Sequence, residues 1–392
     1  MILITHPNLN NIAINYSKEL YAKLEYRKGM IEKVLENIAG GLPHNFSPYT
    51  VTECLAALKA SIDVSNLPQP PTGSSITDVL NHYIDQIRKA NAGPVPAITD
   101  ATLVTQRLQS IFGYNLQDFF SADISTIKSH NEVLNQRTQQ AGLAQSMKDF
   151  FFEYTLYYEI INKHIGNELG IICCPYCNRN YITYILSEKN KRLIGPTYDH
   201  FFSKKDYGFA SLCFFNLIPS CTICNSNLKH EIDFDLTTHL YPYRDEFGEN
   251  ACFDFNFSLA GVGQDSKIIF KPYIRLKDGI SGEDKLKLAG IDDVSGKDKS
   301  GSIKVFRLSE IYESHHDTVE EVHEKFYVNS KHYVGSIEEN LKLLGSGEKE
   351  FYRFHFNNYF DSSDFHKRPL AKLTRDIYNK LKKNQDTGPD RI

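Results

Sequence analysis

The chain contains no tryptophan and only 3 methionines among its 392 residues, and it has no long apolar run. Without about 18 to 20 consecutive apolar residues, we expect no membrane-spanning helix. Residues 1–15 also lack a basic region followed by an apolar run, so we expect no secretory signal. These absences predict a soluble, cytoplasmic protein, and its 41% of hydrophobic residues is enough for a sizeable core.

An excess of basic residues is missing as well. The chain has 44 Lys and Arg against 48 Asp and Glu, which gives a formal net charge of -4. Avid binding to nucleic acid through a whole surface normally requires the opposite balance. If nucleic acid is the substrate, the contact surface is therefore local or is supplied by a partner.

Cysteine is the residue type that is present in an informative pattern. Four of the eight cysteines form two Cys-x-x-Cys pairs, Cys174 with Cys177 and Cys221 with Cys224. Each pair can hold two thiolates about 2.3 Å from one ion, and four thiolates complete a closed, structural zinc site. The alternative is one redox pair beside chance cysteines, but two pairs close in sequence favour zinc.

The other four cysteines have no partner at metal-binding spacing. Cys173 is adjacent to a predicted ligand, but its spacing to Cys177 argues against a role in the site. We expect Cys54, Cys213 and Cys252 to be buried thiols, because free cysteine behaves as a small hydrophobic residue.

Residues 1–170 predict a helical N-terminal scaffold. Apolar periodicity and capping signals indicate helices over 17–39, after Thr50 with Glu53 as a capping box, from Ser75 to about 90, over 100–112 and over 144–168. Residues 67–75 are rich in Pro, Gly and Ser and indicate a loop.

Residues 171–245 contain both cysteine pairs and predict a small separate core. Residues 181–185 and 196–202 are typical of two strands, and a helix can begin at Asn225 after the second pair. Two strands and a helix around a metal form the ββα-metal arrangement. Residues 246–392 predict a mixed, mostly helical region with a hairpin over 253–274, a loop over 277–301 and one or two helices over 308–344. The fold class is therefore α+β, mainly helical with this core inserted.

Four polar residues near the cysteine pairs have the chemistry of a nuclease. Asp199 and His200 are adjacent, so on a strand one could bind a hard cation while the other activates a water. The amide of Asn216 or Asn225 can orient an imidazole or offer an oxygen to Mg²⁺. A cation beside a neutral histidine can hydrolyse a phosphodiester. Any one of these residues alone is more often structural, and only their combination favours a catalytic site.

This combination of residues resembles the HNH endonuclease motif in its zinc-containing ββα-metal form. The resemblance implies that His200 is the general base, that Asn216 positions it, and that Asp199 and Asn225 bind a catalytic Mg²⁺ or Mn²⁺. Asn225 stands where many members of the family carry a third histidine, which makes the pattern H-N-N. The matching Lys229 would contact substrate phosphate, with a solvated helix residue as the alternative. His230 is a competing ligand.

A looser resemblance extends beyond the motif. Four segments are similar to HNH proteins of bacterial anti-phage systems, the HNH subunit of Septu-type systems and some retrons being the nearest: 174–182, 216–221, 240–248 and 372–376. Such proteins typically work with an ATPase that regulates the nuclease, and this chain has no phosphate-binding loop of its own. The resemblance therefore implies antiviral defence and a regulatory ATPase partner.

Three functions remain open at this point. The leading hypothesis is a metal-dependent HNH endonuclease acting on DNA. Cleavage of RNA, including tRNA, is the first alternative, because hydrolysis at phosphorus does not require a 2′-hydroxyl. The second is a catalytically silent, zinc-containing module that binds nucleic acid or a partner. The aromatic stripes of the helical flanks also permit a homodimer.

Overall fold

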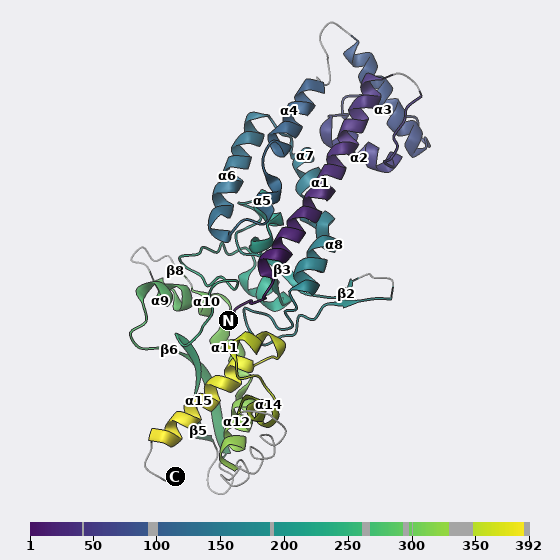
Figure 1. Ribbon diagram of the computed structural model, residues 1–392. Helices are drawn as coiled ribbons and strands as arrows, with labels where there is room; N and C mark the ends of the chain where they lie inside the picture. The colour runs from purple at the N-terminus through teal and green to yellow at the C-terminus, as the bar shows by residue number, and fades with distance from the viewer. Residues whose placement is uncertain are drawn as a thin grey trace. The chain divides into compact units, whose positions relative to one another are not determined.

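The computed structural model describes residues 1–40, 43–92, 101–188, 192–260, 267–292, 298–299, 301–328 and 348–387. Two compact units divide the chain (Figure 1). The helical unit contains Asn10–His164 and Lys204–Asn216. The mixed unit contains Met1–Leu9, Ile165–Ser203 and Leu217–Ile392.

This division differs from the three predicted segments, 1–170, 171–245 and 246–392. The first residues of the chain belong to the mixed unit because their backbone bonds to it: Ile2 N–H donates to Pro175 O at 2.9 Å, and Ile4 N–H donates to Pro242 O at 2.7 Å. Residues 204–216 leave the mixed unit between two of its strands and join the helical unit. The amino-acid composition does not indicate that residues 1–9 belong to the mixed unit or that residues 204–216 belong to the helical unit.

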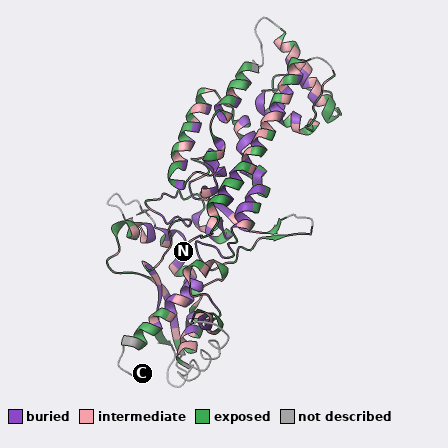
Figure 2. Ribbon diagram, viewed as in Figure 1, coloured by how far each residue is buried: buried purple, intermediate pink, exposed green. Residues whose placement is uncertain are grey.

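The helical unit is built from α-helices with short 3₁₀ and π-helical turns. In chain order these are α1 (Leu9–Ala39), α2 (Val51–Ser61), α3 (Ile76–Asn91), α4 (Ala101–Phe112), α5 (Leu116–Phe120), α6 (Ile124–Gln140), α7 (Gln145–Phe152), η1 (Tyr154–Tyr157), α8 (Tyr158–Ile161), η3 (Phe209–Leu212) and η4 (Phe214–Asn216). The π-helical turn η2 (Asn162–Glu168) begins in this unit and ends in the mixed unit. Buried and exposed residues alternate along α1, as the amphipathic pattern requires (Figure 2). None of the described helices combines the length and the apolar content needed to cross a bilayer.

The capping signals in this unit are confirmed. The Thr50 side chain accepts from Glu53 N–H and the Glu53 side chain accepts from Thr50 N–H, so α2 begins with a complete capping box. The Ser75 side chain accepts from Asp78 N–H at the start of α3. These local bonds satisfy orphan N–H groups without help from distant residues, and for that reason the sequence reveals them.

The single long helix predicted over 144–168 is wrong. α7 ends before Glu153, whose backbone is extended and whose side chain caps the next turn by accepting from Thr155 N–H. The Tyr157 hydroxyl donates to Phe151 O at 2.5 Å and closes the break. The aromatic periodicity therefore continues across separate short helices. The mostly polar helix α6 was not predicted, because it lacks a strong apolar stripe.

The mixed unit combines two-stranded sheets with helices. Its elements are β1 (Ile185–Leu186), β2 (Arg192–Ile194), β3 (Thr197–His200), β4 (Leu217–Ser220), η5 (Ile223–Lys229), β5 (Ala251–Ala260), β6 (Lys267–Leu276), α9 (Gly282–Ala289), β7 (Ile291–Asp292), β8 (Asp298–Lys299), α10 (Ser302–Val305), α11 (Leu308–Glu313), α12 (His316–Val328), α14 (Glu348–Phe356), η7 (Ser362–Lys367) and α15 (Ala371–Thr387). Each described sheet is an antiparallel pair.

The predicted hairpin is confirmed and forms part of the core. β5 pairs with β6 from Ala251 opposite Leu276 to Ala260 opposite Lys267. Helices α12 and α15 pack against this hairpin and against each other (Figure 1). Phe253, Phe255 and Phe270 from the strands meet apolar residues of the helices in one buried cluster. The predicted loop over 277–301 is wrong where α9 forms, because Ser281 caps a helix too short for a periodic signal. The part of the 308–344 helix prediction beyond residue 328 lies outside the described residues.

A buried ion pair joins α15 to the rest of the mixed unit. Lys372 Nζ lies 2.8 Å from Asp376 Oδ2 and donates to Gly248 O at 3.0 Å. The same carboxylate oxygen accepts from Phe253 N–H at 2.9 Å, at the start of β5. Both side chains are about 3% exposed or less. Two of the segments named by the looser resemblance, 240–248 and 372–376, therefore meet here in a structural contact.

We expect Asp376→Ala to lower the free energy of unfolding by about 3–5 kcal/mol, because it leaves the Lys372 ammonium buried without its counterion. Urea unfolding followed by circular dichroism measures the change. The matched control is Asp361→Ala, which breaks an exposed pair with Lys349 and should cost less than about 1 kcal/mol. Equal losses in the two variants would contradict this account of α15.

Candidate metal centre and ββα unit

The four cysteines of the two pairs come together in the mixed unit. The Sγ atoms of Cys174, Cys177, Cys221 and Cys224 all lie within 4.8 Å of one another, and all four residues are buried. The two pairs are brought from distant segments: Cys177 Sγ and Cys221 Sγ are 4.0 Å apart although 44 residues separate them. Four thiolates at 2.3 Å from a tetrahedral zinc ion would be about 3.8 Å apart. The group could therefore hold a metal ion, and its spacing fits zinc.

Hydrogen bonds hold the first cysteine pair in its turn. Cys174 N–H donates to Asn180 O at 2.9 Å, and Asn178 N–H donates to Cys174 O at 2.7 Å. The Asn180 side chain donates to Cys221 Sγ at 3.3 Å, which favours the thiolate of a metal ligand. Hydrogen bonds from the neighbouring thiols lower the pKa of Cys221, whereas burial raises the pKa of Cys174. Bound metal would deprotonate all four.

Asn178 anchors this turn to the start of α15. Its backbone has a positive φ of 49° and its carbonyl accepts from Leu370 N–H at 2.6 Å. Its side chain donates to Phe365 O at 2.8 Å and accepts from Lys372 N–H at 3.1 Å. The Tyr312 hydroxyl adds a bond to Cys177 O at 2.5 Å. The metal centre is thus supported by residues more than a hundred positions away in the sequence.

The other cysteines lie outside this group. Cys54 and Cys213 are buried as predicted, and Cys173 is buried beside the group without joining it. Cys252, the second residue of β5, is only partly buried, so the prediction of a buried thiol is wrong at this position.

The strands and the helix of the ββα unit both differ from the prediction. β3 pairs with β4, with Asp199 opposite Ile218 and His200 opposite Leu217. The predicted strand over 181–185 shrinks to β1, which pairs with β2. After β4 the chain passes through Cys221 into the π-helical turn η5, which begins at Ile223 rather than Asn225. Two antiparallel strands and a helical turn therefore follow one another, but the second strand, β4, is not one of the two strands predicted for this unit.

Asp199 is buried in β3, and each of its two carboxylate oxygens has a partner. Its Oδ2 accepts from the Tyr176 hydroxyl at 2.6 Å. Its Oδ1 lies 3.0 Å from Lys229 Nζ, and the side chains of Asp199 and Lys229 are each 3% exposed. Burial and the neighbouring carboxylate raise the pKa of Tyr176 well above its usual range, so this hydroxyl stays a donor. Asp199 is not placed to hold a cation from solvent, which revises its predicted role as a metal ligand.

Lys229 is neither of the things that the sequence predicted. It is buried at the end of η5, so it is not a solvated helix residue, and it is not available to a phosphate. Besides the ion pair with Asp199, its Nζ donates to His200 O at 2.8 Å and lies 4.8 Å from the centre of the Phe234 ring. The Lys229 ammonium group therefore binds η5 to the end of β3, where it contacts the backbone of His200, the predicted general base. Neither this role nor that of Tyr176 has a signal in the sequence.

The remaining predicted site residues lie at the surface of this unit or at its boundary. His200 is half-buried at the end of β3, and Asn225 is half-buried in η5. His230 is exposed, and its positive φ of 46° ends η5. Asn216 directly precedes β4 but belongs to the helical unit, where its side chain donates to Ala210 O at 3.0 Å. Its predicted role of positioning His200 stays a prediction.

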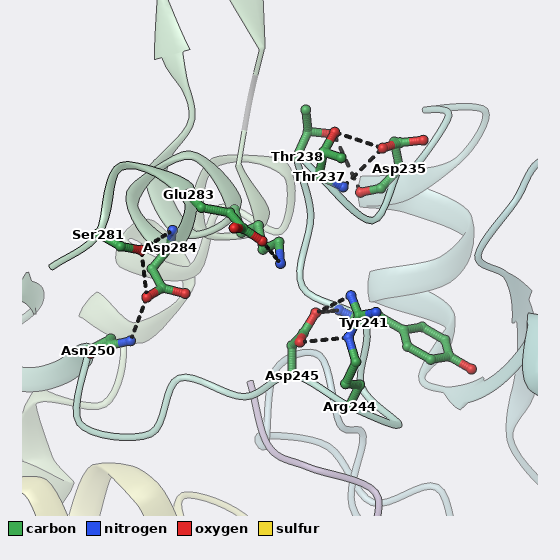
Figure 3. Close-up of polar contacts among 11 residues, drawn as sticks. Asp235, Thr237, Thr238, Tyr241, Arg244, Asp245, Asn250, Ser281, Glu283 and Asp284 are labelled. Carbon is green, nitrogen blue, oxygen red and sulfur yellow. Dashed lines mark hydrogen bonds and ion pairs between the residues drawn. The ribbon is translucent and has the colours of Figure 1, made fainter. Parts of the chain in front are cut away.

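The segment 240–248 supports both strands of the ββα unit. The Tyr241 ring packs against Phe201, the residue after His200, with centroids 4.9 Å apart. The Tyr243 hydroxyl donates to Leu217 O of β4 at 3.0 Å. Asp245 shapes the turn by accepting from Tyr241 N–H at 3.1 Å (Figure 3). The segment 240–248 therefore packs against the end of β3 and the start of β4.

The polar residues near the segment 240–248 hydrogen-bond to each other. Figure 3 shows two groups: Thr237 with Asp235 in one turn, and Ser281 with Asp284 at the start of α9, contacted by Asn250 from a separate segment. The first turn has Thr237 N–H donating to Asp235 at 2.9 Å. In the second group, the Asn250 side chain donates to Asp284 at 3.3 Å. These carboxylates cap turns and helices, and they do not form a second metal site.

Comparisons with protein-family models, curated proteins and solved structures found no match to this chain.

We expect the purified protein to contain one zinc ion per chain, and Cys221→Ser to lose it, because three thiolates bind zinc far more weakly than four. Elemental analysis after dialysis measures the content. Cys173→Ala is the matched control: it removes a buried thiol next to Cys174 and should retain zinc. Zinc loss from this control, or retention in Cys221→Ser, would contradict the assigned ligand set.

We expect Lys229→Met to destabilise the protein by about 3–5 kcal/mol, because it leaves the Asp199 carboxylate buried without a counterion. The double variant Asp199→Asn with Lys229→Met removes both charges and should recover part of that loss. Urea unfolding of the wild type, both single variants and the double variant measures the coupling. Additive losses would show that the two side chains do not depend on each other.

Proposed function

We propose that this chain is an HNH-type endonuclease that hydrolyses phosphodiester bonds in nucleic acid and carries a structural zinc ion. One observation carries the proposal. His200 ends the first strand of an antiparallel pair, and the second strand leads through Cys221 into a helical turn that contains Cys224. This order agrees with that of the ββα-metal motif, and the gathering of the four cysteines agrees with the zinc site that the HNH resemblance implies, so both support the proposal.

His200 is the residue best placed to act as the general base. It is half-buried, so its imidazole can reach solvent while its backbone is fixed. Pairing with Leu217 holds one side of the strand end, and Lys229 Nζ holds the His200 carbonyl. In the proposed reaction the neutral imidazole accepts a proton from a water molecule as that water attacks phosphorus.

The predicted catalytic Mg²⁺ or Mn²⁺ does not fit the residues as they stand. Asn225 offers an amide oxygen, but Asp199 would have to give up Lys229 before it could join. Among the described residues, the only group of three or more potential His, Cys, Asp or Glu ligands is the cysteine group. The proposed reaction therefore contains no step through a divalent ion, and cleavage in Mg²⁺, Mn²⁺ or EDTA decides whether one is required.

The substrate class is proposed from chemistry alone. DNA is our first choice and RNA, including tRNA, is the alternative, because a histidine-activated water can attack either backbone. The net charge of -4 favours recruitment through a partner over avid binding of free DNA. Antiviral defence and a regulatory ATPase partner rest on the resemblance alone and remain predictions.

We expect His200→Ala to lower the rate of cleavage about 10²–10⁴-fold, which is the usual contribution of a general base. Purified protein is incubated with plasmid DNA, single-stranded DNA and total tRNA, each with Mg²⁺, Mn²⁺ or EDTA. His316→Ala is the matched control, because His316 is an exposed histidine at the start of α12 and is not one of the candidate site residues. Circular dichroism and zinc content show that both variants fold.

Three outcomes separate the candidate functions. Cleavage that is lost in His200→Ala and kept in His316→Ala supports the endonuclease and identifies its substrate. Undiminished cleavage by His200→Ala excludes His200 as the base. Binding of nucleic acid without cleavage under every metal condition favours the zinc-containing binding module.

A further inference from the structure

The mixed unit contains a pocket whose lining includes no residue of β3, β4 or η5. Its volume is about 460 Å³, within the range of small-molecule sites. One face of α12 lines one side, and the segment from the end of α14 into α15 lines the other. Tyr181, which follows the first cysteine pair, completes the lining. None of these lining residues is one of the four cysteines, but the backbones of Leu370 and Arg368 reach the first cysteine turn, through their bonds to Asn178.

Two cationic side chains face this pocket. Arg368 is oriented by its Nη1, which donates to the Asn357 carbonyl at 2.7 Å and to the Asn357 side chain at 2.8 Å. Among the described residues, its Nε and Nη2 make no hydrogen bond, so a fork of donors is left for a ligand. Lys325 lines the opposite wall, 3.8 Å from the one acidic lining residue, Glu321. The arrangement suits an anion with oxygens on more than one side.

The wall between α14 and α15 is rigid and strained. Asn357 and Leu370 both line the pocket with positive φ, 52° and 60°, which is unusual for any residue other than glycine and costly for leucine. The buried Asn358 fixes them by donating to Pro369 O at 3.0 Å and to Thr374 Oγ1 at 3.3 Å. Strain that the surroundings enforce is typical of binding sites, where it pre-organises the contacts.

Tyr181 supplies an exposed aromatic surface at the edge of the pocket. It is 61% exposed, although the backbone beside it is held by an isolated β-bridge with Cys173. An exposed aromatic side chain on a fixed backbone is the usual platform on which nucleic-acid bases stack. A phosphate near Arg368 and a base on Tyr181 would together account for the polar and the aromatic parts of the lining.

We propose that this pocket binds a nucleoside phosphate, as a free nucleotide or as one unit of a single strand. The phosphate contacts Arg368 and Lys325, and the base stacks on Tyr181. The proposal does not depend on the nuclease activity of the ββα unit, because none of these residues contributes to that unit. If both proposals hold, the pocket is a second contact of the protein with nucleotides.

The absence of tryptophan makes a site-specific measurement available. Tyr181→Trp preserves an aromatic surface at an exposed position and introduces the chain's sole tryptophan. The full-length variant is titrated with AMP, UMP, a short oligo-dT strand and inorganic phosphate, and tryptophan fluorescence is recorded. We expect a nucleotide to quench the tryptophan fluorescence. We expect Arg368→Gln or Lys325→Gln in the same background to raise the dissociation constant of the nucleotide about 10- to 100-fold. Arg353→Gln, an exposed arginine outside the pocket lining, should leave it unchanged.

The outcomes support or overturn the proposal as follows. Quenching by AMP or UMP that depends on Arg368 indicates a free nucleotide, whereas quenching by oligo-dT alone indicates a strand. Equal binding of inorganic phosphate would reduce the pocket to an anion site and overturn the nucleotide assignment. No quenching, or quenching that Arg368→Gln and Lys325→Gln leave unchanged, would overturn it entirely. Zinc content and circular dichroism confirm that each variant is folded.

Discussion

The meeting of four cysteines is the constraint on which the rest of the mixed unit depends. Cys177 and Cys221 are 44 residues apart, yet their Sγ atoms are 4.0 Å apart. Closing this contact places β3 and β4 beside each other and starts η5 next to them. The first cysteine turn is in turn fixed by Leu370 and Tyr312 from the far end of the chain. A metal ion would cross-link the two cysteine pairs, which are separated by a long stretch of chain.

Buried ion pairs complete this organisation. Lys229 with Asp199 holds η5 to β3, and Lys372 with Asp376 holds α15 to β5. Each pair is buried and carries further hydrogen bonds, which is the condition under which a buried charge is tolerated. The consequence for function is direct. A carboxylate that the HNH resemblance assigns to a metal ion instead pairs with Lys229 and helps to align the strand that carries His200, so the proposed site and the folding of the unit share the same few residues.

Local signals account for what could be predicted. Features that depend on residues within a few positions, or on a fixed spacing, could be predicted from the sequence. These are the capping box at Thr50, the cap at Ser75, the β5–β6 hairpin and the membership of the four-cysteine group. The break at Glu153 and the helix α9 could not be predicted, because they depend on a single backbone bend and on a helix too short for periodicity. The pairing of β3 with β4 is not a local property either, since the intervening residues 204–216 belong to the other unit.

The sequence by itself determined which residues could bind metal, where the main helices begin, and that His200 lies between two Cys-x-x-Cys pairs. Only the tertiary structure decided what the charged residues do. Asp199 and Lys229 are 30 positions apart, and their burial against Tyr176 follows from strand register and helix placement. The same holds for the Arg368 pocket, whose walls come from α12, the end of α14 and the start of α15. Spacing reveals chemistry that is local, whereas burial and pairing arise only when distant segments pack.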